Sequence, residues 1–123
     1  MTQILLVEDD LEICEILQFY LLKQSNYNVT VAHSSKEARM LTGLRNYDLI
    51  LMDIKMPVMN GLDATKIIRG ENKEIPIIMQ TAYAFTADRE NAMAAGASEV
   101  LVKPITLSAL RTCLSRFLPQ LQW

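Results

Sequence analysis

The sequence predicts an α/β fold built on a parallel sheet, and three observations lead to this expectation. Five short apolar runs recur along the 123 residues, helix-like segments lie between them, and four of the five runs are followed by polar residues suited to a binding site. Strands that alternate with helices form parallel sheets with helices on both faces. We therefore expect one doubly wound domain with five strands and five helices over residues 1–123.

The apolar runs are rich in Val, Ile, Leu and Met, and they lack a regular alternation with polar residues. Such runs are typical of strands buried on both faces, as in a parallel sheet. We expect strands at residues 4–7, 28–32, 48–52, 75–80 and 100–102.

The segments after these runs carry helical patterns with recognisable ends. Asp10 is a predicted N-cap for the first helix, and Ser34 with Glu37 is a predicted capping box for the second. Gly96 suits the position after the end of the fourth helix. The helices are expected after Asp10 through residue 21, after Ser34, and at residues 62–69, 86–95 and 107–118.

Composition and charge exclude several classes of protein. Half of the residues are hydrophobic and 21% are charged, which suits a packed core and not a disordered chain. The net charge of −2 leaves no basic patch, so direct nucleic-acid binding is not expected. No apolar run is long enough to span a membrane, and the acidic N-terminus does not resemble a signal peptide, so we expect a cytoplasmic protein. Cys14 and Cys113 are expected to be reduced core thiols.

Polar residues follow four of the five predicted strands. Glu8 and Asp9 come after the first strand, Asp53 after the third, Thr81 after the fourth and Lys103 after the fifth. Parallel strands end at the same edge of a sheet, and ligands of open α/β sheets bind at that edge. The sequence therefore predicts that acids, a hydroxyl and an ammonium group gather on one side of the domain.

The chemistry of this predicted site follows from its residue types. Carboxylates brought close together repel one another and must take up a proton or bind a cation. Oxygen ligands without nearby Cys or His favour Mg²⁺ or Mn²⁺ over zinc. A lysine supplies a charge suited to phosphate, and a threonine hydroxyl supplies a hydrogen-bond donor. Together they predict a site in which a carboxylate carries a phosphoryl group.

Four motifs, in this order, resemble those of the receiver domains of two-component response regulators: VEDD at 7–10, MDIKMPVMNG at 52–61, TA at 81–82 and LVKPI at 101–105. The resemblance covers essentially the whole chain. It implies a flavodoxin-like fold of the CheY type with strand order 2-1-3-4-5. This order would place the second strand at the sheet edge, which explains why no site residue follows it.

The resemblance also implies the roles of the acidic residues. Asp53 would be the phosphoacceptor. Mg²⁺ would be bound by Asp9, Asp53 and the main-chain carbonyl of Lys55, while Glu8 would act through a water molecule.

Further roles implied by the resemblance concern the fourth and fifth strands. Thr81 and Lys103 would contact the phosphoryl oxygens, and the peptide bond from Lys103 to Pro104 would be cis. Receivers often carry Tyr or Phe three residues before this lysine, whereas this chain has Val100. We therefore expect the relay from the threonine to the surface of the fourth and fifth helices to differ. Lys55 and Tyr83 are expected to flank the entrance of the site.

The resemblance also implies that the loop after the third strand wraps the acidic site. It contains Met56-Pro57, in which proline restricts the backbone, and Asn60-Gly61, which readily supplies turn conformations. We therefore expect Asn60-Gly61 to act as a turn before the third helix.

The function implied by the resemblance is that of a signalling module and not of an enzyme, apart from its own phosphorylation and dephosphorylation. The phosphoryl group would come from a sensor histidine kinase, a hybrid kinase or a phosphotransfer domain, and a phosphorylation-dependent dimer is left open. A Mg²⁺-dependent aspartyl-phosphate phosphohydrolase is one alternative. The haloacid-dehalogenase type, however, needs an acid where this chain has Lys55. A receiver-like module that binds partners without phosphorylation is the other alternative, and the complete set of acids and lysine argues against it.

Overall fold

The computed structural model describes residues 2–24, 26–56, 59–82 and 86–118, and over these residues strands and helices alternate as expected. The strands are β1 (Thr2–Val7), β2 (Tyr27–Ala32), β3 (Leu49–Asp53), β4 (Ile77–Thr81) and β5 (Glu99–Val102). The helices are α1 (Leu11–Leu21), α2 (Ser35–Leu44), α3 (Gly61–Glu71), α4 (Thr86–Ala95) and α5 (Leu107–Phe117).

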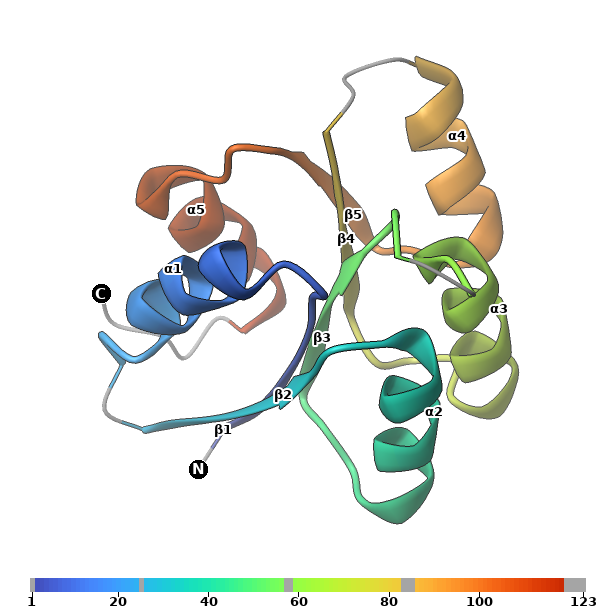
Figure 1. Cartoon of the computed structure of the whole chain (residues 1–123), viewed down its shortest axis with the longest axis horizontal. Helices are drawn as coiled ribbons and strands as arrows, with labels where there is room; N and C mark the ends of the chain where they lie inside the picture. The colour runs from blue at the N-terminus through green and yellow to red at the C-terminus, as the bar shows by residue number, and fades with distance from the viewer. Residues whose placement is uncertain (1, 25, 57–58, 83–85, 119–123) are drawn as a thin grey trace.

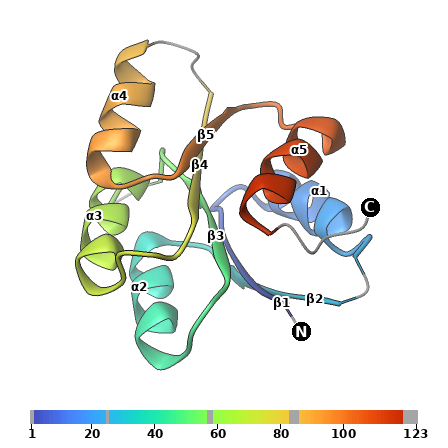
Figure 2. The same ribbon diagram turned by 180° about the vertical axis from the view of Figure 1, so that it is seen from behind.

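The strands form one parallel sheet in the order β2-β1-β3-β4-β5, which confirms the order implied by the family resemblance. Helices α1 and α5 cover one face of the sheet, and α2, α3 and α4 cover the other (Figure 1). The view from behind shows the same three layers (Figure 2). The strand register aligns Val7 with Met52, Asp53 with Gln80 and Thr81 with Val102. The carboxyl ends of the strands therefore meet at one edge.

The sheet separates two hydrophobic clusters, and both faces of its central strands are buried. Ile4 and Leu6 of β1 lie in the cluster under α1 and α5, while Leu5 and Val7 lie in the cluster under α2, α3 and α4. All four side chains are fully buried. Burial of one such side chain stabilises the fold by about 1.5–3 kcal/mol. This burial on two faces explains why the apolar runs lack polar alternation.

The helix ends have the local structure that their residues predict. The side chain of Asp10 accepts hydrogen bonds from the backbone N–H groups of Glu12 and Ile13 at 2.9 and 3.2 Å. Ser34 accepts one from the N–H of Glu37 at 3.1 Å. These contacts confirm Asp10 as an N-cap and confirm the Ser34 half of the predicted capping box. Gly96 follows α4 with a φ of +113°, a conformation that residues with a Cβ adopt rarely.

Strand β4 differs slightly from the prediction, because it covers residues 77–81 and not 75–80. Pro76 has no N–H group to donate to a sheet, and its carbonyl accepts a hydrogen bond from the N–H of Ile50 just before the ladder begins. Strand β3 likewise includes Asp53 as its last residue. Cys14 and Cys113 are buried and free. Among the described residues, every helix is too short or too polar to cross a bilayer.

Candidate functional site

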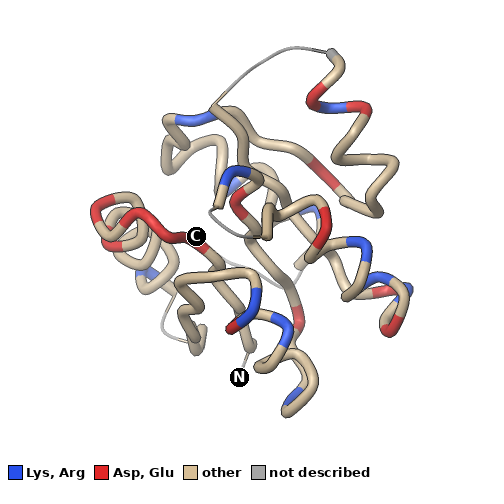
Figure 3. The backbone as a smooth tube through the Cα atoms, turned by 45° about the vertical axis from the view of Figure 1, so that its right-hand side comes forward, with Lys and Arg blue, Asp and Glu red and all other residues tan. Residues whose placement is uncertain are grey.

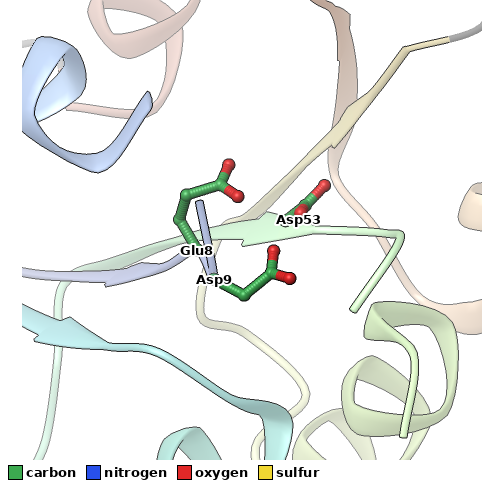
Figure 4. A group of neighbouring side chains, drawn as sticks. All are labelled: Glu8, Asp9 and Asp53. Carbon is green, nitrogen blue, oxygen red and sulfur yellow. The ribbon is translucent and has the colours of Figure 1, made fainter. Parts of the chain in front are cut away.

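Three acidic side chains converge at the carboxyl edge of the sheet. Glu8 and Asp9 follow β1, and Asp53 ends the neighbouring strand β3. One carboxylate oxygen from each lies within 4.8 Å of one from each of the others, as the close-up of their side chains illustrates (Figure 4). Glu8 and Asp53 are buried, whereas Asp9 is exposed. Figure 3 shows that the acids after β1 form one red stretch, which runs into the start of α1.

Lys103, which follows β5, connects two of these carboxylates. Its Nζ lies 3.0 Å from Oε1 of Glu8 and 3.1 Å from Oδ1 of Asp53. The main chain of the lysine is fixed to β4, because its N–H donates to the carbonyl of Thr81 at 2.7 Å. The peptide bond from Lys103 to Pro104 is cis. The cis bond confirms the expectation from the LVKPI motif.

Burial has the largest single effect on the pKa values of Glu8 and Lys103. It raises the pKa of Glu8 from 4.5 to about 7, the nearby negative charge of Asp53 adds to the rise, and the hydrogen bond from Lys103 opposes it. Burial alone would lower the pKa of Lys103, but its hydrogen bond to Glu8 and the charge of Asp53 outweigh that effect and raise it. Without a cation, the site is therefore ready to hold one proton on Glu8 near neutral pH.

The acids and the lysine line a shallow cleft with a volume of about 200 Å³. Its walls also include Asp10, Lys55 and Ala82. Hard oxygen donors without Cys or His in the lining suit Mg²⁺, which prefers carboxylates and water. The donor set therefore fits Mg²⁺, one of the two ions that the residue types favoured.

The remaining predicted site residues lie at different places around the cleft. Lys55 is exposed and lines the cleft, in keeping with its predicted place at the entrance. Thr81 ends β4 beside the site, but it is buried and does not line the cleft. Tyr83 and Pro57 lie outside the described residues. Val100 is buried in the cluster under α2, α3 and α4.

The Asn60-Gly61 pair has a role that differs from the predicted turn. Asn60 is the N-cap of α3, since its side chain accepts a hydrogen bond from the N–H of Asp63 at 3.0 Å. The N–H of Gly61 donates to the carbonyl of Ile54 at 2.7 Å. A Cβ on Gly61 would collide with the carbonyl oxygen of Asp53. Gly61 is therefore needed because α3 begins against the backbone of the site, a contact that no local sequence signal reveals.

Comparisons with known proteins agree with this geometry. A family model described as the response regulator receiver domain matches residues 4–115. The transcriptional regulatory protein ZraR of Escherichia coli O157:H7 is 36% identical over 115 residues, which cover 94% of this chain and 26% of ZraR. The chain thus spans about a quarter of the length of this curated relative.

Two solved structures share the fold closely. The chemotaxis protein CheY4 of Vibrio cholerae has a TM-score of 0.89 and 31% identity, with 96% of this chain and 99% of that chain covered. The receiver domain of sensor histidine kinase PA1611 from Pseudomonas aeruginosa PAO1, solved with a magnesium ion in the active-site cleft, has a TM-score of 0.88 and 35% identity. That match covers 97% of this chain and 98% of that one. This chain therefore belongs to the response regulator receiver domains, the signalling modules of two-component systems.

Proposed function

We propose that Asp53 accepts a phosphoryl group from a phosphorylated histidine of a partner protein. The observation that supports this most directly is the position of the Asp53 carboxylate. It sits at the end of β3, 3.1 Å from the Lys103 ammonium and beside the carboxylates of Glu8 and Asp9. A nucleophilic carboxylate next to a fixed cation and a set of hard oxygen ligands suits phosphoryl transfer, which depends mainly on positioning and charge neutralisation.

The transfer step involves one bond formed and one broken. An oxygen of the Asp53 carboxylate attacks the phosphorus atom, an O–P bond forms, the N–P bond of the donor breaks, and the imidazole leaves with the electron pair. Lys103 is near enough to Asp53 to balance charge on the phosphoryl oxygens. Water later hydrolyses the aspartyl phosphate and restores the carboxylate.

Magnesium is the cation that we propose for this site. Asp9, Asp53 and the main-chain carbonyl of Lys55 would bind it, and Glu8 would act through a water molecule. A bound Mg²⁺ would supply charge neutralisation for the transferred group. The buried Glu8 would then hold its place in the site through the hydrogen bond from Lys103.

The response of the domain to phosphorylation would begin at Thr81. Its hydroxyl is buried beside the cleft, so we propose that Thr81 shifts toward the site to contact a phosphoryl oxygen. Val100 offers no aromatic ring to follow that shift, and it packs in the cluster under α2, α3 and α4. The signal would therefore reach α4 through packing changes around Val100 and not through the rotation of a ring.

The proposed partner is a sensor histidine kinase, a hybrid kinase or a phosphotransfer domain. ZraR is a transcriptional regulatory protein, whereas the PA1611 receiver comes from a sensor histidine kinase, so receivers similar to this chain occur in both contexts. We place the domain in the cytoplasm, where free thiols such as Cys14 and Cys113 stay reduced.

The test is phosphorylation of the purified chain with Mg²⁺ and acetyl phosphate, followed by intact-mass measurement. We expect one acid-labile phosphoryl group on the wild-type protein and none on Asp53→Asn. Asp63→Asn is the matched control, because Asp63 is exposed in the first turn of α3 and should leave labelling unchanged. Labelling that persists in Asp53→Asn would refute the assignment.

The same experiment separates the proposed function from its alternatives. Steady multiple turnover of a phosphorylated metabolite by the purified chain would instead indicate a phosphohydrolase. An unlabelled wild-type protein would indicate a binding module that works without phosphorylation. Light scattering before and after labelling reports whether phosphorylation produces a dimer.

A further inference from the structure

A second pocket lies on the face of the sheet covered by α1 and α5, behind the acidic cleft. It has a volume of about 340 Å³, within the range of pockets that bind small molecules. Its walls come from α1, through Ile13, Leu17 and Tyr20, and from the turn between β5 and α5, through Pro104 and Ile105. Figure 1 shows α1 and α5 side by side on this face of the sheet. The walls of this α1–α5 pocket are thus mostly apolar.

One polar side chain in the pocket wall has no hydrogen-bond partner within the described part of the chain. Gln80 of β4 is fully buried, and neither its Oε1 nor its Nε2 has a hydrogen-bond partner among the described residues. Burial of an amide without hydrogen bonds is costly, so natural proteins rarely leave such a group unpaired. Gln80 places a polar amide in a strand that is buried along its whole length, so packing of the core alone does not explain it.

The charges around the pocket restrict what it can bind. Lys103 also lines it, but its ammonium is already paired with Glu8 and Asp53 on the other side. No other charged side chain is among the described residues that line it. An ion would therefore lose its hydration without gaining a partner, and the pocket favours a neutral molecule.

We propose that the α1–α5 pocket binds a small neutral molecule with an apolar body and an amide-like head. The head, as in a primary amide or a lactam, carries one donor and one acceptor, which match the Oε1 and Nε2 of Gln80. The terminal torsion of glutamine is broad, so the amide turns toward such a head without a change in the backbone. The apolar body packs between α1 and the turn that precedes α5.

The test is an NMR titration of the ¹⁵N-labelled chain without Mg²⁺ or phosphodonor. Cyclohexanecarboxamide is the probe, and its methyl ester analogue, which lacks the N–H donors, is the matched compound. We expect the amide to shift the side-chain NH₂ signal of Gln80 and to bind about tenfold more tightly than the ester, or by about 1.4 kcal/mol. Absence of shifts in the pocket, or equal binding of the two compounds, overturns the proposal.

Two variants complete the design. Gln80→Met keeps the length of the side chain and removes the amide, so it should bind amide and ester equally and should melt no lower than wild type. Gln18→Met is the control, since Gln18 of α1 hydrogen-bonds to Cys14 and does not line the pocket. If Gln80→Met keeps the preference for the amide, or unfolds at a lower temperature than wild type, the side-chain amide of Gln80 is not the group that binds the amide head. Because no phosphoryl chemistry is involved, this outcome is independent of the proposed role of Asp53.

Discussion

The buried carboxyl of Glu8 should control how the stability of the metal-free domain depends on pH. Its pKa is raised from 4.5 in the unfolded chain to about 7 in the folded protein, mainly by burial. Below pH 4.5 the group is protonated in both states. Between pH 4.5 and about pH 7, Glu8 holds a proton in the folded protein that it has lost in the unfolded chain. The free energy of unfolding should therefore fall as the pH rises through this interval.

The size of this effect follows from the shift. Each unit of pKa difference corresponds to 1.36 kcal/mol, so a rise from 4.5 to about 7 amounts to about 3 kcal/mol. Glu8→Gln removes the titrating group and keeps a side chain of similar shape. The variant should lack this part of the pH dependence. We compare the free energy of unfolding of Glu8→Gln with that of wild type at each pH. Between pH 4.5 and values above pH 7, this difference should shift in favour of the variant by up to about 3 kcal/mol.

Urea unfolding at several pH values between 4.5 and 8, with a chelator present, measures the difference directly. Glu12→Gln is the control, because Glu12 is exposed in the first turn of α1. Saturating Mg²⁺ should raise the free energy of unfolding of wild type more than that of Glu8→Gln, since the variant has lost one of the acids at the proposed metal site. If wild type and Glu8→Gln show parallel pH profiles in the absence of metal, burial does not raise the pKa of Glu8 as argued.

Three further substitutions test contacts between segments that are distant in the sequence. Gly61→Ala should reduce the free energy of unfolding by about 1–3 kcal/mol in urea and slow labelling by acetyl phosphate, because its Cβ collides with the backbone of Asp53. Arg69→Met should cost about 2 kcal/mol in a thermal melt, because the guanidinium donates to the carbonyls of Gly96 and Ile75. Glu99→Gln should cost about 1 kcal/mol, with an effect that shrinks at high salt, because the two arginines that it pairs with are more than half exposed.

The fold and the position of the site were predictable because both follow from the order of elements along the chain. Apolar runs buried on two faces predict a parallel sheet, and a parallel sheet brings its carboxyl ends together. This reasoning alone predicts that Glu8, Asp53 and Lys103 meet, as they do. The strand order itself came from the family resemblance, because right-handed crossovers permit more than one order.

The details that the sequence did not predict all depend on contacts between distant segments. Nothing near Gly61 indicates that α3 begins against the carbonyl of Asp53. Nothing near Gln80 indicates that its amide has no hydrogen-bond partner in the part of the chain that the structure describes. Thr81 could be placed at the end of a strand, but whether its side chain lines the cleft depends on the packing of its neighbours. Local patterns predict elements, whereas such contacts require the assembled tertiary structure.

The charges at the site explain why its residues occur together. Three carboxylates and one ammonium leave two negative charges in a partly buried space, a balance that a divalent cation would neutralise. Without a cation, the repulsion is relieved by a proton, and the raised pKa of Glu8 identifies the group that takes it. Glu8 is the most deeply buried of the three acids and shares Lys103 with Asp53. Protonation of Glu8 and binding of a divalent cation are therefore competing ways to balance the same charge, so metal affinity should fall as the pH drops through 7.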